Sequence, residues 1–296
     1  HAERELVIRE SFRAMGSSME ILLDAPDTPS ARAAIAAGRG EIARLEGLLS
    51  RFRPDSELSR LNARRRGRVG SDLLRVLGAA LELRRRTGGR FDPTVARAVA
   101  GAGYDRDFAT IGDDPRPAAP AAPAGGVVLL DRSATWVLLG PDVDVDLGAI
   151  AKGDAADRAC ALVSAAGPCL VNAGGDVVVS GPRADGPWPV AVAAREGELV
   201  LDLARGALAT SGVDRRRWTR AGRALHHAID PRTGASARTD LLRATAAAPT
   251  GAEADALATA LLVAGGHGAR RLADAWDVPA ALVDADGAMT LAGGLR

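Results

Sequence analysis

Several residue types are scarce in this chain of 296 residues, and each scarcity argues against a class of protein. Two cysteines, Cys160 and Cys169, are too few for a disulfide framework and lack the spacing of a zinc site, so we interpret them as small buried residues. No apolar run reaches the length of a transmembrane helix. The net charge of +1 at pH 7 favours neither nucleic acid nor an anionic membrane as a partner.

The rarest polar residues draw attention to particular positions. Glutamine is absent, Lys152 is the only lysine, Tyr104 is the only tyrosine, and Asn62 and Asn172 are the only asparagines. Arginine, by contrast, is abundant and clusters at residues 64–66, 84–86 and 215–217. We interpret these clusters as solvated helix ends and loops, with a docking surface for an acidic partner as the alternative. The rare residues are expected to mark places where their chemistry is needed.

Hydrophobic periodicity predicts both helices and strands. Helices are predicted at residues 29–49, 71–87 and 152–165. Strands are predicted at 127–130, 135–139, 189–193, 197–203 and 241–247, and residues 281–291 are predicted to form an Asp-Gly hairpin. Because the strands and helices do not alternate regularly, we predict an α+β fold with largely antiparallel sheets. The chain is expected to be one domain, residues 1–296, with an exposed Pro/Ala-rich loop at about 113–126.

Local patterns predict four finer features. The motif "DVDVDLG" alternates, which places Asp142, Asp144 and Asp146 on one face of a strand. A turn is expected at residues 16–18. Thr250 begins a capping box with Glu253, and Gly265 is expected to end that helix.

Two stretches contain residues suited to catalysis or ligand binding. Asp255 and Thr259 are four residues apart, so they share a helix face and offer the hard oxygen ligands that Mg²⁺ prefers. His227 precedes an Asp-Pro turn and is a candidate general base. Ordinary structural roles remain open for all three residues. The chain lacks HExxH, GxSxG, CxxC and a GxGxxG after a strand, so the zinc-protease, serine-hydrolase, redox and dinucleotide-binding motifs find no support.

Seven motifs in a fixed order carry a family resemblance. They are "AMGSSMEI", "SRFRPDSELSRLN", "GGRFDPTVA", "VDLGAIAKGDAADRA", "VNAGGDVVVSG", "HHAIDPRTG" and "ADALATALLVAGG", and they run from about residue 8 to residue 292. This succession resembles the ApbE family of FAD:protein FMN transferases. The resemblance implies a single unit of two interlocked lobes with FAD in the cleft between them. It also implies an Mg²⁺-dependent transfer of FMN from FAD to a threonine hydroxyl of an acceptor protein, with release of AMP.

The resemblance also implies roles for individual residues. His227 would be the base that accepts the threonine proton. Asp255, Thr259 and the carbonyl of Ala149 would hold Mg²⁺, and Ala258 stands where some members have a second acidic ligand. The implied flavin contacts are Met15, Phe52, Ala102, Gly103, Tyr104, Asp146, Lys152 and Ile229.

The chain departs from the family pattern around the flavin. Phe52 replaces a common tyrosine, Ala102 replaces a tryptophan, and Tyr104 replaces an aromatic residue that is often phenylalanine. Lys152 opens a helix, where an ammonium and backbone N–H groups can face a ligand anion. An ion pair of Lys152 with Asp146 or Asp176 is the structural alternative.

Two other functions remain open at this point. One is an FAD pyrophosphatase that produces FMN and AMP, and the other is a non-catalytic flavin-binding protein. The expected partners are FAD and an acceptor protein with a threonine flavinylation motif, and neither nucleic acid nor a membrane span is expected. The visible sequence favours a cytoplasmic protein, whereas removal of a leader would make it an exported one.

Overall fold

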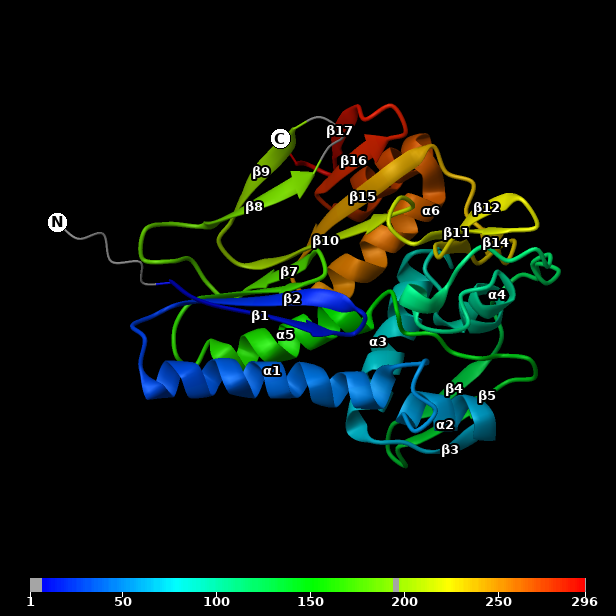
Figure 1. Cartoon of the computed structure of the whole chain (residues 1–296), viewed down its shortest axis with the longest axis horizontal. Helices are drawn as coiled ribbons and strands as arrows, with labels where there is room; N and C mark the ends of the chain where they lie inside the picture. The colour runs from blue at the N-terminus through cyan, green and yellow to red at the C-terminus, as the bar shows by residue number, and fades with distance from the viewer. Residues whose placement is uncertain (1–6, 194–196, 296) are drawn as a thin grey trace.

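The computed structural model describes residues 7–193 and 197–295 (Figure 1). The helices are α1 Pro29–Leu49, α2 Glu57–Arg64, α3 Ser71–Arg86, α4 Ala96–Gly101, α5 Ala151–Val163 and α6 Gly251–Trp276. The strands of the large sheet are β1 Val7–Ala14, β2 Ser17–Asp24, β6 Cys169–Ala173, β7 Asp176–Val179, β10 Gly206–Gly212, β15 Leu241–Ala248, β16 Ala280–Asp284 and β17 Met289–Ala292. The remaining strands are β3 Arg66–Arg68, β4 Val128–Asp131, β5 Trp136–Leu139, β8 Trp188–Ala193, β9 Glu198–Leu203, β11 Arg217–Arg220, β12 Arg223–His226, β13 Ile229–Asp230 and β14 Ala235–Ser236.

The main sheet has eight strands in the order β1-β2-β6-β7-β10-β15-β16-β17, and neighbouring strands are antiparallel. The described strands also form a sheet β3-β5-β4 and three two-stranded ribbons. This arrangement confirms the predicted α+β class with largely antiparallel sheets. The predicted helices correspond to α1, α3 and α5, and the Asp-Gly hairpin corresponds to β16 and β17.

The two faces of the large sheet are covered differently. Along β6, Cys169, Val171 and Ala173 join the main core with the helices, whereas Leu170 joins a smaller core with Trp188 of β8. This alternation follows from the two-residue period of a strand. The helical face is layered, because α5 packs against the sheet and against both α1 and α6 (Figure 1). The first turn of α5 is thereby brought beside α6.

The crossing of α5 and α6 depends on two glycines. A Cβ added to Gly153 would overlap the carbonyl of Gly251, and a Cβ added to Gly251 would lie 2.6 Å from the Gly153 oxygen. The N–H groups of Gly251 and Ala252 also bond to the Asp157 carboxylate at 2.7 and 3.0 Å, which ties the start of α6 to α5. The backbones therefore approach more closely than any side chain allows.

Gly153→Ala is expected to destabilise the protein by about 2–3 kcal/mol, because backbone atoms cannot move aside as a flexible side chain can. Gly40→Ala on exposed α1 is the matched control, since nothing lies within 4 Å of its added Cβ. The control should be neutral or stabilising by about 0.5–1 kcal/mol. Urea unfolding measures both changes, and equal stability of the two variants would contradict the close crossing.

Three local predictions need correction. Residues 141–146 form no strand, although Val143 and Val145 are buried in alternation as predicted. The reason is that Asn62 takes the place of a partner strand: its side chain bonds to the N–H and C=O of Val145 at 2.8 and 2.9 Å. The first turn lies at Met15 and Gly16 rather than at residues 16–18, because Ser17 and Ser18 already pair in β2.

The N-cap bond of the predicted capping box is confirmed, whereas the Glu253 carboxylate pairs with Arg86, and the helix stop is only partly correct. Thr250 Oγ1 accepts a hydrogen bond from the Glu253 N–H at 3.2 Å. Gly265 breaks the helical conformation with a φ of 72°, but a second helical segment follows at once within α6. The Asp240 carboxylate accepts a bond from the Gly266 N–H at 2.7 Å, which caps this new segment.

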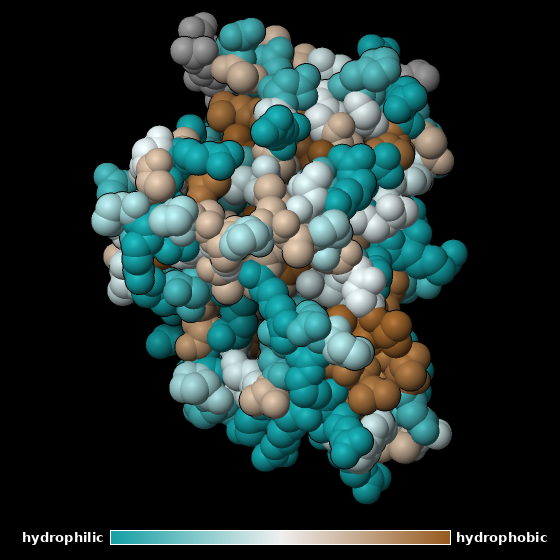
Figure 2. Space-filling view, turned by 90° about the vertical axis from the view of Figure 1, so that its right-hand side faces the viewer, coloured by the Kyte–Doolittle hydropathy of each residue, from teal (hydrophilic) through white to brown (hydrophobic). Residues whose placement is uncertain are grey.

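Apolar side chains gather on the outer face of the small sheet. Val127, Leu129, Trp136 and Leu138 are between 38 and 59% exposed. Figure 2 shows apolar surface at the level that β4 and β5 occupy in Figure 1.

Among the described residues, no helix has the length and apolar character needed to cross a bilayer.

Candidate functional site

Lys152, in the first turn of α5, lies between two buried carboxylates. Its Nζ is 2.7 Å from Asp176 Oδ2 and 3.0 Å from Asp255 Oδ2. The contact with Asp255 is a directed hydrogen bond, whereas the contact with Asp176 is an ion pair without hydrogen-bond geometry. Of the two partners considered for Lys152, Asp176 is the one present, because Asp146 pairs with Arg51 instead.

This cluster carries one negative charge more than its ammonium balances. Burial, and then the charge of Asp176, raises the pKa of Asp255 to about 7. Burial alone would lower the pKa of Lys152, but the two carboxylates outweigh that effect and raise it. The site therefore holds a fixed ammonium and a carboxylate that lacks a full counter-charge.

The other residues predicted to bind metal lie on α6 or just before α5. Thr259 Oγ1 is 2.9 Å from the hydroxyl of Ser211 on β10. Ala258 is fully buried in the main core, and Ala149 packs partly buried against it. Within residues 7–193 and 197–295, no three His, Cys, Asp or Glu side chains gather closely enough to hold a metal ion. A cation here would depend on Asp255, with hydroxyl and carbonyl oxygens as further ligands.

The predicted flavin contacts meet in an aromatic cluster. Ala102, Tyr104 and Ile229 share a small apolar core with Trp218, whose Nε1–H donates to the Ala102 carbonyl at 2.8 Å. The ring of Phe52 is 5.3 Å from that of Tyr104, and the Tyr104 ring is 5.8 Å from that of Trp218.

Gly103 sits at the centre of this cluster with a φ of 107°, where a Cβ would meet Arg220 at 2.8 Å and Trp218 at 3.2 Å. Glycine is therefore required for the close packing at this position. Burial raises the pKa of the Tyr104 hydroxyl.

Arg51 joins this cluster to the turn before α5. Its guanidinium carbon lies 4.1 Å from the Phe52 ring centre and 4.6 Å from that of Tyr104. Its Nε is 2.9 Å from Asp146 Oδ2, and both side chains are 12% exposed. The other Asp146 oxygen accepts the Gly148 N–H at 2.7 Å, which holds the Asp-Leu-Gly turn. Both oxygens of Asp146 thus have partners.

His227 feels the charges of both Arg216 and Lys152, and the charge of Arg216 also reaches Tyr104 in the aromatic cluster. Burial, and then the charge of Arg216, lowers the pKa of His227 to about 3, and Lys152 adds to this effect. The residue is partly exposed, but its Nδ1 is shielded from water and has no hydrogen-bond partner. Arg216 also approaches Ser17 Oγ at 3.3 Å.

Met15, two residues before Ser17, has a φ of 52°, an unusual conformation for a residue with a side chain. The turn between β1 and β2 therefore stands beside Arg216. Met15 itself packs, partly buried, against the main core.

Sequence reasoning missed four residues of this site, Arg51, Ser211, Arg216 and Trp218. It considered Asp176 as an alternative partner of Lys152, and that pairing is confirmed. Arg216 belongs to an arginine cluster that we interpreted as solvated, yet it is only partly exposed. One sequence signal could have identified Arg51 as a site residue, because it directly precedes Phe52 in "SRFRP". The aromatic cluster can stack against a planar ring, the Lys152 ammonium can bind an anion, and His227 can accept a proton.

Phe52→Ala is expected to weaken FAD binding about tenfold, because one aromatic wall of the cluster is lost. Phe52 is 39% exposed, so its removal should leave the fold intact. Trp136→Ala, an aromatic residue of similar exposure on the small sheet, is the control and should leave affinity unchanged. Flavin fluorescence titration measures both, and equal affinities would exclude Phe52 from the flavin pocket.

Comparison with known proteins places this site in a family context. The model of the ApbE family matches residues 15–283. A protein of Klebsiella pneumoniae named FAD:protein FMN transferase is 30% identical over 277 residues, which cover 88% of this chain and 79% of that protein. A protein of Rhodobacter capsulatus with the same name is 33% identical over 298 residues, covering 93% of this chain and 55% of that protein.

Solved structures share the fold. The crystal structure of the ApbE protein from Thermotoga maritima superposes with a TM-score of 0.86 at 27% identity and covers 97% of both chains. The apo flavinyl transferase ApbE of Pseudomonas stutzeri gives a TM-score of 0.81 at 23% identity, covering 97% of this chain and 94% of that one. At that identity the second likeness concerns the fold alone.

Proposed function

The chain belongs to the ApbE family, and from that premise we propose that it is an Mg²⁺-dependent FAD:protein FMN transferase that modifies a threonine hydroxyl of an acceptor protein. The observation that carries the proposal is the position of Lys152. Its ammonium lies between the buried carboxylates of Asp176 and Asp255, and its charge reaches the imidazole of His227. A base, a fixed cation and an undercompensated carboxylate are what the transfer of an FMN phosphoryl group requires.

The net charge of the carboxylates around Lys152 is suited to a divalent cation. When both are ionised, Asp176 and Asp255 together exceed the charge of Lys152 by one, and burial, followed by the charge of Asp176, raises the pKa of Asp255 to about 7. Asp255, Thr259 and the Ala149 carbonyl would hold Mg²⁺. When bound, Mg²⁺ would neutralise charge on the FAD diphosphate. Lacking an acid at position 258, the site would leave more of the coordination to water.

The remaining roles belong to this chain's own side chains. Phe52 and Tyr104 would flank the flavin ring, and Arg51 would hold Asp146 beside them. His227 would take the proton of the acceptor hydroxyl while its oxygen bonds to the FMN phosphorus and the bond to AMP breaks. The lowered pKa of His227 keeps its imidazole neutral at pH 7, which is the form that accepts a proton.

The test is an incubation of the full chain with FAD, Mg²⁺ and an acceptor protein that carries a threonine flavinylation motif. The proposal expects flavin fluorescence on the acceptor band of a denaturing gel and release of AMP in equal amount. Release of AMP from an acceptor-free mixture at the same rate would instead identify an FAD pyrophosphatase. Bound but unchanged FAD would identify a flavin-binding protein.

A further inference from the structure

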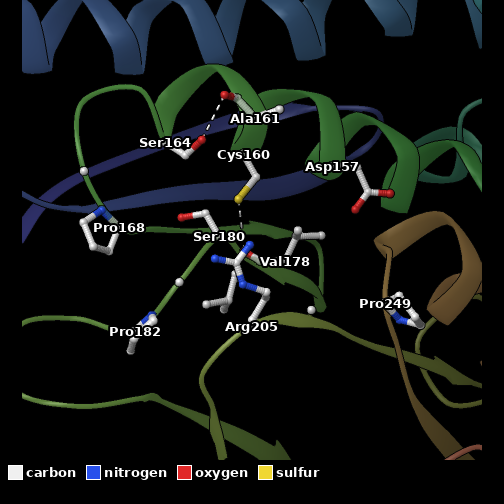
Figure 3. Close-up of a pocket in the computed structure, with 14 residues that line it drawn as sticks. Asp157, Cys160, Ala161, Ser164, Pro168, Val178, Ser180, Pro182, Arg205 and Pro249 are labelled. Carbon is white, nitrogen blue, oxygen red and sulfur yellow. Dashed lines mark hydrogen bonds between the residues drawn. The ribbon is translucent and has the colours of Figure 1, made fainter.

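A groove of about 700 Å³ lies along the second half of α5, whereas Lys152 lies in the first turn of that helix (Figure 3). Its walls come from the second half of α5, from β7 and from the segments before β6 and β10. None of the residues that the sequence assigned to flavin or metal lines it. Figure 3 shows the Cys160 sulfur pointing from α5 toward Val178 of β7. The groove therefore presents a thiol that the proposed function does not use.

The two cysteines of the chain meet at this point. Cys160 Sγ and Cys169 Sγ are 3.5 Å apart, and the thiol of Cys169 also lies 3.4 Å from the Cys160 carbonyl oxygen. Both residues are buried, Cys160 at 3% and Cys169 at 0% exposure. Only Cys160 lines the groove, so a small reagent that enters there meets Cys160 first.

The geometry is close to that of a covalent bond. Disulfide sulfurs are about 2.05 Å apart, so sulfurs separated by 3.5 Å need to approach by only about 1.5 Å. Cys169 is anchored while this happens, because its backbone N–H bonds to Ser180 Oγ at 2.9 Å. Cys160 stands near the end of α5, three residues before Val163, where a small adjustment disturbs little of the helix.

We propose that Cys160 and Cys169 are a reversible dithiol–disulfide pair that is oxidised by a peroxide entering through the groove. The Cys160 sulfur attacks one oxygen of the peroxide, the O–O bond breaks, and the departing oxygen leaves as water with the thiol proton. The Cys169 sulfur then attacks the Cys160 sulfenic acid, the S–O bond breaks, and a second water leaves. Two electrons pass from the sulfurs to the peroxide, and one S–S bond forms.

The bond would join α5 to β6 behind the candidate site. Lys152 lies at the start of α5, and Asp176 begins β7, which pairs with β6. One end of the Lys152–Asp176 contact, at 2.7 Å, would thus lie on the cross-linked helix and the other on the strand that pairs with cross-linked β6. Since the cross-link encloses a short loop that is already folded, its main effect is to resist separation of α5 from the sheet.

The experiment uses the reduced full chain, treated with hydrogen peroxide under native conditions. The expected result is a mass loss of about 2 Da, disappearance of both free thiols and a peptide that contains both cysteines, all reversed by dithiothreitol. The thermal unfolding midpoint should rise by about 5 °C after oxidation. Cys160→Ala and Cys169→Ala should each abolish the mass loss and the rise in midpoint.

Three results would overturn the proposal. In the first, both thiols of the folded protein remain free at a peroxide dose that fully oxidises the unfolded protein. Cys160 could gain oxygen and stop at the sulfinic acid although Cys169 is present. The cross-link could instead join two chains, which a non-reducing gel reveals as a dimer.

Discussion

His227→Ala is expected to lower FMN transfer by about 10²–10⁴-fold, because the acceptor hydroxyl loses the base that takes its proton. Binding of FAD should persist, since the aromatic cluster of Phe52, Tyr104 and Trp218 does not depend on the imidazole. Single-turnover labelling of the acceptor measures the rate, and fluorescence titration measures the affinity. A loss of affinity that matches the loss of rate would make His227 a binding residue rather than a base.

The neighbouring histidine offers a matched control. His226 Nε2 lies 3.1 Å from the Ala237 carbonyl oxygen, so this ring has a structural partner. His226→Ala should reduce transfer far less than His227→Ala, and any effect should appear in stability. Equal losses of transfer in the two variants would contradict the separate roles.

The pH profile of the unaltered protein gives an independent check on His227. Burial and the charge of Arg216 lower the pKa of His227, so the proton-accepting form persists well below the usual range. At an Mg²⁺ concentration that saturates the protein, so that Asp255 stays ionised although burial raises its pKa to about 7, the rate should change little between pH 7.5 and 5.5, whereas a histidine of ordinary pKa would cost about tenfold at the lower value. A tenfold fall over that interval would show that the base titrates normally.

Asp255→Asn is expected to reduce transfer by at least about 10²-fold at low Mg²⁺ and to raise the Mg²⁺ concentration needed for half-maximal rate. The variant removes the charge that a cation would neutralise, and it leaves Lys152 paired with Asp176 alone. The measurement is the transfer rate as a function of Mg²⁺ concentration.

Glu253→Gln is the control for this variant, because Glu253 lies in the same helix but pairs with Arg86 at the surface. Its Mg²⁺ dependence should match that of the unaltered protein. If Asp255→Asn responds to Mg²⁺ as the control does, Asp255 is not a metal ligand, and its role is confined to holding Lys152.

The rare residues turned out to be informative for a physical reason. Asn62 takes the place of a strand beside Val145, and Asn172 Oδ1 accepts the Gly175 N–H at 2.8 Å and so holds the turn between β6 and β7. Lys152 binds two carboxylates with one compact charge, a task to which the wider arginine fork is poorly suited. Each of these three side chains acts through contacts of a specific shape and length, and another polar side chain of different shape would not make the same contacts.

The predicted strand at residues 142–146 shows where pattern alone is insufficient. Alternation correctly predicted that Val143 and Val145 are buried, because burial follows the local period. Whether the backbone then joins a sheet depends on which partner is adjacent, and that partner is the side chain of Asn62, 83 residues away.

The sequence by itself determined the α+β class, the bounds of α1 and α3, the family and the order of the site motifs, since periodicity and short motifs are properties of neighbouring residues. Only the tertiary structure decided that Lys152 pairs with Asp176 and Asp255, that Arg51 and Arg216 among so many arginines belong to the site, and that Cys160 meets Cys169. These contacts depend on how α5 is seated between α1, α6 and the sheet. The position of α5 results from packing across the whole core, and no local stretch of sequence specifies it.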